Sequence, residues 1–304
     1  MNTIFSLIKP LAISACIITG AVSCANQSFQ QMGSSLLSST GLVSGSQADA
    51  MFKAGGKIVA AASPLTSEQE YYLGRSVSAM ILTEYPLYRD ATATNYVNTV
   101  GNALAAYSDR PETFVGYHFA ILNTSEINAL STPGGFVFIS RGLLKSMPNE
   151  DALAAVLAHE IGHIVKGHGV KAISQANLSS AAMILGKEAA SSYGNNTVQA
   201  VTSAFGDSVT DVFNTILKKG YSRSQEYDAD AYASELLKRV GYSHGSLVSM
   251  LHSLESAHGG KESGLFATHP SPEKRISELS DSKDDSAAPS LKRTNRFKSA
   301  IKNG

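Results

Sequence analysis

Apolar residues recur at intervals of three and four in one stretch of the chain, a spacing typical of a helix that buries one face. These positions are Leu153, Val156, Leu157, Ile161 and Ile164. Asn149, a favourable N-cap residue, precedes the stretch, and Gly167 and Gly169 follow it. The pattern therefore predicts a helix that begins after Asn149 and ends near Gly167, with one apolar side in the core.

Other helical segments flank this stretch. Thr66 and Gln69 form a capping box that opens a first helix. A second amphipathic helix is indicated by the apolar and aromatic positions Tyr96, Val97, Val100, Leu104 and Tyr107. Residues 173–185 and 198–217 show two more helical patterns, which Ser, Gln and Asn interrupt. Because of these polar residues, neither pattern is predicted to cross a membrane.

Two short segments have the alternation or the β-rich composition of strands. Tyr117, Phe119 and Ile121 alternate with other residues, and the run Phe136–Ile139 follows a glycine turn. We expect them to form a small antiparallel sheet beside the helix after Asn149. The fold class is therefore α+β and mainly helical, with one domain over residues 64–281.

Inside the predicted helix, His159 and His163 are four residues apart and lie on one face, so both imidazoles can bind one zinc ion. Glu160 lies beside that face and can act as general base toward the attacking water. This spacing on a helix is typical of zinc metalloproteases, and it predicts one Zn²⁺ per chain.

A catalytic zinc also needs a third protein ligand. One metalloprotease class takes it from a His six residues after the second His, but Gly169 at that position excludes this class. Glu226 is the expected ligand, because Asp230 follows one helical turn later and can accept the second N–H of a ligand imidazole. Glu188 is the competing candidate, although no acidic residue lies four positions after it.

The glycine turn and the strand after it are candidates for substrate binding. An exposed strand edge can bind an extended peptide by strand addition, and glycines let two backbones approach closely. The residues concerned are Gly134, Gly135, Phe136 and Val137. The alternative is an ordinary hairpin with no role in binding.

Several motifs together resemble one protease family. The motifs are Asn128-Ala129, Pro133–Val137, Gly142–Leu144, His159–His163, Thr268–Pro270 and Arg275-Ile276. They are similar to motifs of the gluzincin family that contains the HtpX protease, the type I CAAX prenyl protease and the Oma-type mitochondrial protease. The resemblance runs from about Tyr71 to Leu279 and favours the soluble periplasmic lipoprotein branch, which includes the BepA, LoiP and YcaL proteases. It implies a zincin-type domain that cleaves misfolded envelope proteins.

His269 is expected to lie near the zinc, in a loop that Pro270 and Pro272 stiffen. The imidazole can stabilise the oxyanion of the tetrahedral intermediate. The family resemblance implies a second possibility, in which His269 occupies the fourth zinc position as a latch. The sequence leaves both roles open. Arg275 is expected to anchor this loop or to contact the intermediate.

The N-terminal segment predicts export. Residues 11–22 form an apolar run that is too short to span a membrane and suits a secretory signal. Ala21-Val22-Ser23-Cys24 resembles a bacterial lipobox, so we expect cleavage of residues 1–23 and lipidation of Cys24, with simple secretion as the alternative. Residues 24–63 are rich in Ser and Gly and are typical of a tether. By the general sorting rule for bacterial lipoproteins, the absence of Asp at position 25, where this chain has Ala25, favours anchoring in the outer membrane over the inner one.

The charge balance of the chain bears on which partners it can bind. Lys and Arg total 25 and balance 25 Asp and Glu, so nucleic acid is not an expected partner. Residues 282–304 are basic and are predicted to be a disordered tail. Five further histidines have no metal-ligand spacing and are expected to be ordinary surface or core residues: His118, His168, His244, His252 and His258.

These patterns together predict a zinc metalloendopeptidase of the bacterial periplasm, anchored to the outer membrane through Cys24. Its expected partners are extended or unfolded polypeptides. The alternative is a latched or non-catalytic zinc protein that binds polypeptides as a chaperone does. The presence of Glu160 favours the enzyme, because binding alone needs no general base.

Overall fold

The computed structural model describes residues 65–173, 206–243, 245–258, 269, 272–280 and 290–301. The predicted signal peptide, the tether, the lipidated Cys24 and the competing ligand Glu188 lie outside these ranges. Across the described ranges, no helix has the length and apolar character that a membrane span requires.

The first two described helices begin as their capping residues predict. Helix α4 (Ser67–Glu84) opens with Thr66, whose hydroxyl accepts a hydrogen bond from the Gln69 backbone while the Gln69 side chain bonds back to Thr66. Helix α5 (Ala91–Ala106) opens with Asp90, whose carboxylate accepts from the Ala93 backbone. The predicted capping box and second amphipathic helix are therefore confirmed.

Three short strands form one mixed sheet in the order β1-β3-β2. They are β1 (His118–Leu122), β2 (Ala129–Thr132) and β3 (Phe136–Ser140). β3 pairs antiparallel with β2 and parallel with β1, so the expectation of a wholly antiparallel sheet is wrong. The three-residue turn between β2 and β3 forces those two strands into a hairpin. β3 lies between β2 and β1, and because β2 runs opposite to β1, β3 runs parallel to β1.

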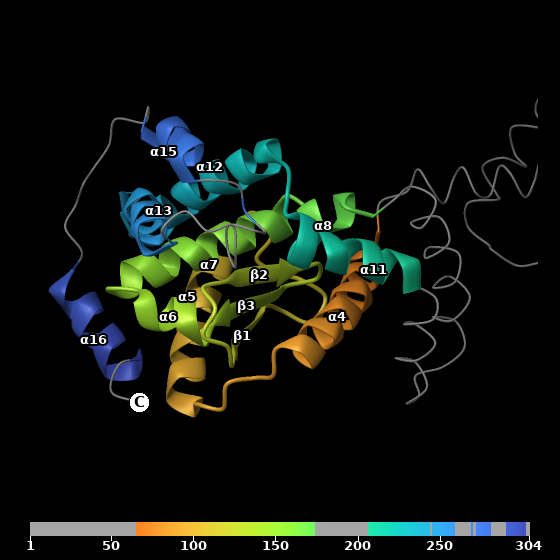
Figure 1. The fold of residues 1–304 in the computed structure, drawn as a ribbon, viewed down its shortest axis with the longest axis horizontal. Coiled ribbons are helices and arrows are strands. Elements are labelled where there is room, and N and C mark those ends of the chain that lie inside the picture. Colours follow the sequence, from red (N-terminus) through yellow and green to blue (C-terminus); the bar gives the residue numbers. More distant parts are fainter. Residues whose placement is uncertain are drawn as a thin grey trace, which may run out of the picture. The chain divides into compact units, whose positions relative to one another are not determined.

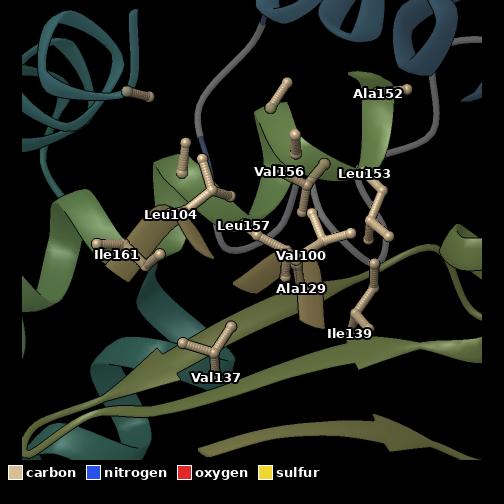
Figure 2. Packing of buried hydrophobic residues seen from close by; sticks show 14 of the residues in the cluster. Val100, Leu104, Ala129, Val137, Ile139, Ala152, Leu153, Val156, Leu157 and Ile161 are labelled. Carbon is tan, nitrogen blue, oxygen red and sulfur yellow. The ribbon is translucent and has the colours of Figure 1, made fainter. Parts of the chain in front are cut away.

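After the sheet, α6 (Arg141–Ser146) leads into α7 (Glu150–Val165), which crosses one face of the sheet (Figure 1). The Asn149 side chain accepts a hydrogen bond from the Ala152 backbone, as an N-cap does. Leu153, Leu157 and Ile161 of α7 lie over the sheet residues Val137 and Ile139 (Figure 2). This interface forms the centre of the hydrophobic core.

Helix α7 is buried on every side, whereas the sequence predicts burial of one face. Every residue from Glu150 to Ile164 is buried. The helices α12 (Arg223–Val240) and α13 (Gly245–His258) pack on α7 on the side away from the sheet (Figure 1). The polar side chains of α7 therefore face other protein groups rather than water.

Three further helical segments precede or follow α12 in the described fold. The π-helical turn η1 (Thr215–Lys219) continues α11 (Gly206–Asn214), and α15 (Pro272–Ser280) packs on α12 and α13. Gly241 ends α12 in the left-handed conformation, with φ 84°, that is common at helix C-termini.

The predicted disordered tail contains a packed helix, α16 (Leu291–Ile301). Phe297 is completely buried and Ile301 nearly so, and α16 contacts α5 and α7. Arg293 and Arg296 form ion pairs with Asp151 and Glu150 at the start of α7. The sequence predicted disorder because the segment is highly charged. The prediction missed the helix because the local sequence shows neither the burial of Phe297 and Ile301 nor the distant acidic partners of the arginines.

Candidate metal centre

The two histidines of α7 direct their Nε2 atoms toward each other. The Nε2 atoms of His159 and His163 are 3.0 Å apart, and both side chains are buried. This geometry follows from helical periodicity, since residues four apart lie one above the other on the same face.

Helix α12 brings Glu226 against this pair. Ser222 opens α12 with a capping box, so Glu226 lies in its first turn. The Glu226 Oε1 atom is 3.4 Å from His163 Nε2, and its Oε2 atom is 3.6 Å from His159 Nε2. A Cβ at Gly162 would lie 3.0 Å from the Ala229 carbonyl oxygen, so Gly162 permits the close packing of α7 and α12.

His269 completes a group of four buried side chains. Its Nδ1 atom is 2.9 Å from Glu226 Oε1 and 3.4 Å from His159 Nε2. One ligand atom from each of His159, His163, Glu226 and His269 lies within 4.8 Å of the others. The structure therefore brings the two predicted His ligands, the predicted Glu ligand and His269 to one point.

The donor chemistry of this group fits a divalent metal ion. Three imidazole nitrogens and a carboxylate oxygen are ligands that Zn²⁺ accepts. Burial and the neighbouring His159 hold the pKa of His163 well below its usual range. Although burial raises the pKa of Glu226, His269, His159 and Arg275 lower it by more, so Glu226 is an anion.

A buried ion pair stands behind His159. Asp230 Oδ1 is 2.9 Å from His159 Nδ1, and Arg275 donates two hydrogen bonds to the same carboxylate, of 2.7 and 2.6 Å. Burial and Arg275 lower the pKa of His159, but Asp230 and Glu226 raise it by more, to about 9. Arg275 thus lies beside the group of four, with its Nη1 atom 3.2 Å from Glu226 Oε2.

A fourth imidazole, that of His168, lies behind His163. The Nδ1 atoms of His168 and His163 are 2.9 Å apart, and His168 Nε2 is 3.4 Å from Asp228 Oδ2. Burial and Lys171 lower the pKa of His168. His168 is buried and lies outside the metal group, which is compatible with the expected surface or core residue, but its contact with His163 was not predicted. It has no metal-ligand spacing, and its contact with His163 depends on the turn at Gly167.

Glu160 points into the same space from α7. Its Oε2 atom accepts a 2.7 Å hydrogen bond from the Ser131 hydroxyl on β2, and its Oε1 atom is 3.8 Å from His269 Nε2. The side chains of Glu160 and Ser131 are both buried. β2 thus fixes the carboxylate that the sequence identifies as the general base.

The residues that were predicted to bind substrate do not lie on an edge strand of the sheet. Phe136 and Val137 belong to β3, the central strand, whose two edges are paired with β1 and β2. A Cβ at Gly134 would lie 2.5 Å from the Tyr71 Cα atom, so this glycine serves the packing of the turn on α4. Gly135 has φ 106° and lies close to the Gly116 carbonyl. The expectation of a free edge at these residues is wrong, and the strand at the sheet edge beside the metal group is β2.

Three residues of the site carry no recognisable motif. They are Ser131, His168 and Tyr221. The buried Tyr221 ring stacks on the His163 ring with centroids 4.2 Å apart. A small pocket opens beside these groups, and its lining residues are Glu70, Ser131, Thr132, Pro133, His163, Ile164, Gly167, Gly169, Val170 and Tyr221. The early residues of this set are separated from Tyr221 by a long stretch of chain, so local sequence gives no signal for the pocket.

Comparison with known proteins agrees with this geometry. The chain is 26% identical over 220 residues to the beta-barrel assembly-enhancing protease of Escherichia coli, which covers 72% of this chain and 44% of the relative. It is 30% identical over 164 residues to the metalloprotease YcaL of the same organism, covering 54% of this chain and 61% of YcaL. The mitochondrial metalloendopeptidase OMA1 of Schizosaccharomyces pombe is 28% identical over 206 residues.

The chain spans about half the length of the beta-barrel assembly-enhancing proteases that it matches. A family model for Peptidase family M48 matches residues 91–283, which include all four members of the metal group and Glu160. On this match, the chain belongs to Peptidase family M48.

Proposed function

We propose that this protein is a zinc metalloendopeptidase that cleaves extended or misfolded polypeptides in the bacterial cell envelope. The observation that carries the proposal is the buried group of His159, His163, Glu226 and His269, with Glu160 held beside it. The names of the relatives, a beta-barrel assembly-enhancing protease and a metalloprotease, support the same activity.

His159, His163 and Glu226 would hold the zinc ion. When bound, zinc acts as a Lewis acid that polarises the scissile carbonyl and makes water a better nucleophile. Glu160 removes a proton from the attacking water and passes it to the leaving amine. The hydrogen bond from Ser131 holds the Glu160 carboxylate in place for both transfers.

The polypeptide substrate would add to the sheet along β2. β2 lies at the edge of the sheet and its Ser131 contacts Glu160, so a strand paired there would pass beside the general base. All four residues of β2 are buried, so the segments that pack on β2, α4 and η1, would have to move before a substrate strand could pair there. Main-chain hydrogen bonds give such binding little dependence on side chains. This mode suits a protease that recognises an unfolded segment rather than a particular sequence.

The position of His269 supports a latched resting state. Its Nδ1 atom is within 4.8 Å of the donor atoms of His159, His163 and Glu226, so it stands where a fourth ligand would. A metal ion with four protein ligands lacks the open position that catalysis requires. His269 would then have to leave this position before a substrate could bind. In the oxyanion alternative, His269 stays near the site and donates to the intermediate.

The test compares cleavage of an unfolded protein by the zinc-loaded full chain and by the variants Glu160→Gln and His269→Ala. We expect Glu160→Gln to keep its zinc and lose about 10²–10⁴-fold in kcat. A latch predicts faster cleavage by His269→Ala, whereas oxyanion stabilisation predicts slower cleavage with zinc retained. If wild type and His269→Ala both bind zinc and cleave nothing, the protein is a zinc-bound polypeptide-binding protein instead.

We also propose that Cys24 is lipidated and anchors the enzyme to the outer membrane. This part of the proposal rests on the lipobox-like sequence and on the absence of Asp at position 25. Metabolic labelling with a fatty acid should mark the wild type and leave Cys24→Ser unlabelled. Recovery of labelled protein in the inner membrane fraction would contradict the outer-membrane assignment.

A further inference from the structure

A sharp turn places His168 behind one of the metal-binding histidines. Gly167 has a left-handed conformation, with φ 66°, and α8 (His168–Lys171) begins directly after it. The turn folds the His168 ring back against His163, with ring centroids 5.0 Å apart. His168 is 1% exposed, so no bulk water competes for its contact with His163.

The hydrogen bond between these rings has only one polarity that is compatible with metal binding. His163 directs its Nε2 atom toward His159 and Glu226, so this nitrogen must be unprotonated when it binds a metal. The neutral ring then carries its proton on Nδ1, which is 2.9 Å from His168 Nδ1. His168 Nδ1 must therefore be the acceptor, and the His168 proton lies on Nε2.

Asp228 is positioned to hold this second proton. Its Oδ2 atom is 3.4 Å from His168 Nε2, and its Oδ1 atom is 3.1 Å from Lys166 Nζ. The carboxylate favours the Nε2–H form of His168, which leaves Nδ1 free to accept from His163. His163 thus donates its Nδ1 proton to His168, and His168 directs its Nε2 proton toward Asp228.

We propose that His168 is a positioning residue for the metal ligand His163, whose tautomer and ring orientation it fixes. Asp228 in turn fixes the tautomer of His168. The inference rests on the metal site proposed above and extends that site by one imidazole and one carboxylate. Groups that orient metal ligands in this way usually contribute 10- to 100-fold to metal affinity.

The first test measures the Zn²⁺ dissociation constant of the full chain by competition with a chromophoric chelator. The matched variants are His168→Asn and His168→Leu, which have nearly the same shape. Asn keeps an oxygen acceptor close to the position of Nδ1, and Leu does not. We expect His168→Leu to weaken Zn²⁺ binding by about 10- to 100-fold and His168→Asn by about threefold or less.

Three other outcomes of the Zn²⁺ affinity measurement would overturn the inference. Equal Zn²⁺ affinity in the wild type and His168→Leu would overturn the inference and leave the metal site intact. Equal losses in both variants would also overturn it, because the ring would then act by packing rather than as an acceptor. A wild type that binds no Zn²⁺ would overturn the metal site and the inference together.

A second measurement needs no variant and so does not depend on how a variant folds. Long-range ¹⁵N–¹H spectra of the zinc-loaded protein, labelled at histidine nitrogens, report which ring nitrogen carries each proton. We expect protons on His163 Nδ1 and on His168 Nε2. A proton on His168 Nδ1 would overturn the inference, because that nitrogen could not then accept from His163.

Discussion

The two ends of α7 use charged and polar residues in opposite ways. At its C-terminal end, His159 and His163 belong to a buried group that could hold a metal ion, and Glu160 lies beside it. At its N-terminal end, Glu150 and Asp151 are equally buried and bind arginines of α16. The C-terminal end carries the proposed metal site, and the N-terminal end carries buried ion pairs that join two helices. Burial of polar groups therefore does not by itself identify a functional site.

The N-terminal end also shows how a buried carboxylate is stabilised. Glu150 accepts hydrogen bonds from the hydroxyls of Tyr96 and Tyr242, the second at 2.8 Å, and pairs with Arg296. Burial raises the pKa of Glu150, but these three partners lower it by more. Because these groups come from α5, α7, α16 and the residue that follows the C-cap of α12, the arrangement joins four parts of the chain. The comparison predicts that changes at this end alter stability and leave the metal centre as it is.

The largest expected effect is at the apolar anchor of α16. Phe297→Ala removes a fully buried aromatic ring beside Tyr96, so we expect a loss of about 3–5 kcal/mol in the free energy of unfolding. Urea denaturation of the zinc-loaded protein measures this loss. The exposed neighbour Lys298, changed to Ala, is the control and should differ from wild type by about 0.5 kcal/mol or less. A large fall in the Zn²⁺ affinity of folded Phe297→Ala would contradict the prediction that changes at the N-terminal end of α7 leave the metal centre as it is.

Glu226→Gln tests the opposite end. We expect Zn²⁺ affinity to fall by more than about 100-fold, because loss of a supporting group alone costs 10- to 100-fold and this change removes a proposed ligand. Chelator competition measures the affinity. The exposed Glu278→Gln on α15 serves as the matched control. Unchanged affinity in Glu226→Gln would show that Glu226 is not a ligand.

Arg296→Ala should have an intermediate effect. It leaves the buried Glu150 carboxylate with its two tyrosine partners but without its counterion. Because the Arg296 side chain is half exposed, we discount the cost of breaking a buried pair to about 2 kcal/mol of unfolding free energy. Urea denaturation measures it, and cleavage per folded molecule should not change. Loss of cleavage in the folded variant would show that the two ends are coupled.

The smallest expected effect is a dependence on pH. The pKa of Glu150 is lowered in the folded protein, so the stability from its ionised form is present above its unfolded pKa of about 4.5. That stability is lost as the pH falls through the lower, folded pKa. Glu150→Gln should therefore be less stable than wild type at pH 7, by about 1–2 kcal/mol, and the difference should shrink in acid. A difference that is constant from pH 7 to acid would exclude this origin.

Much of the metal-binding helix could be predicted from the sequence because its signals are local. Asn149 caps α7, the apolar spacing sets its core-facing side, and residues four apart must share a face. His159 and His163 therefore had to face one point once α7 formed. Similar reasoning predicted the capping box at Thr66.

Tertiary packing decided everything that depends on distant partners. Gly162 lets α12 approach closely enough to bring Glu226 to the histidines, and the turn at Gly167 places His168 behind His163. The strand order puts β2, rather than the expected strand, beside Glu160.

The clearest contrast between local and distant information is α16. By itself, its sequence is basic and typical of a solvated tail, and its two apolar residues give little sign of a buried face. Its arginines meet carboxylates more than a hundred residues away in the chain. The sequence determined which residues could bind a metal, because helical periodicity is a local property. Only the tertiary structure decided which charges would be buried together, because that depends on how the helices pack.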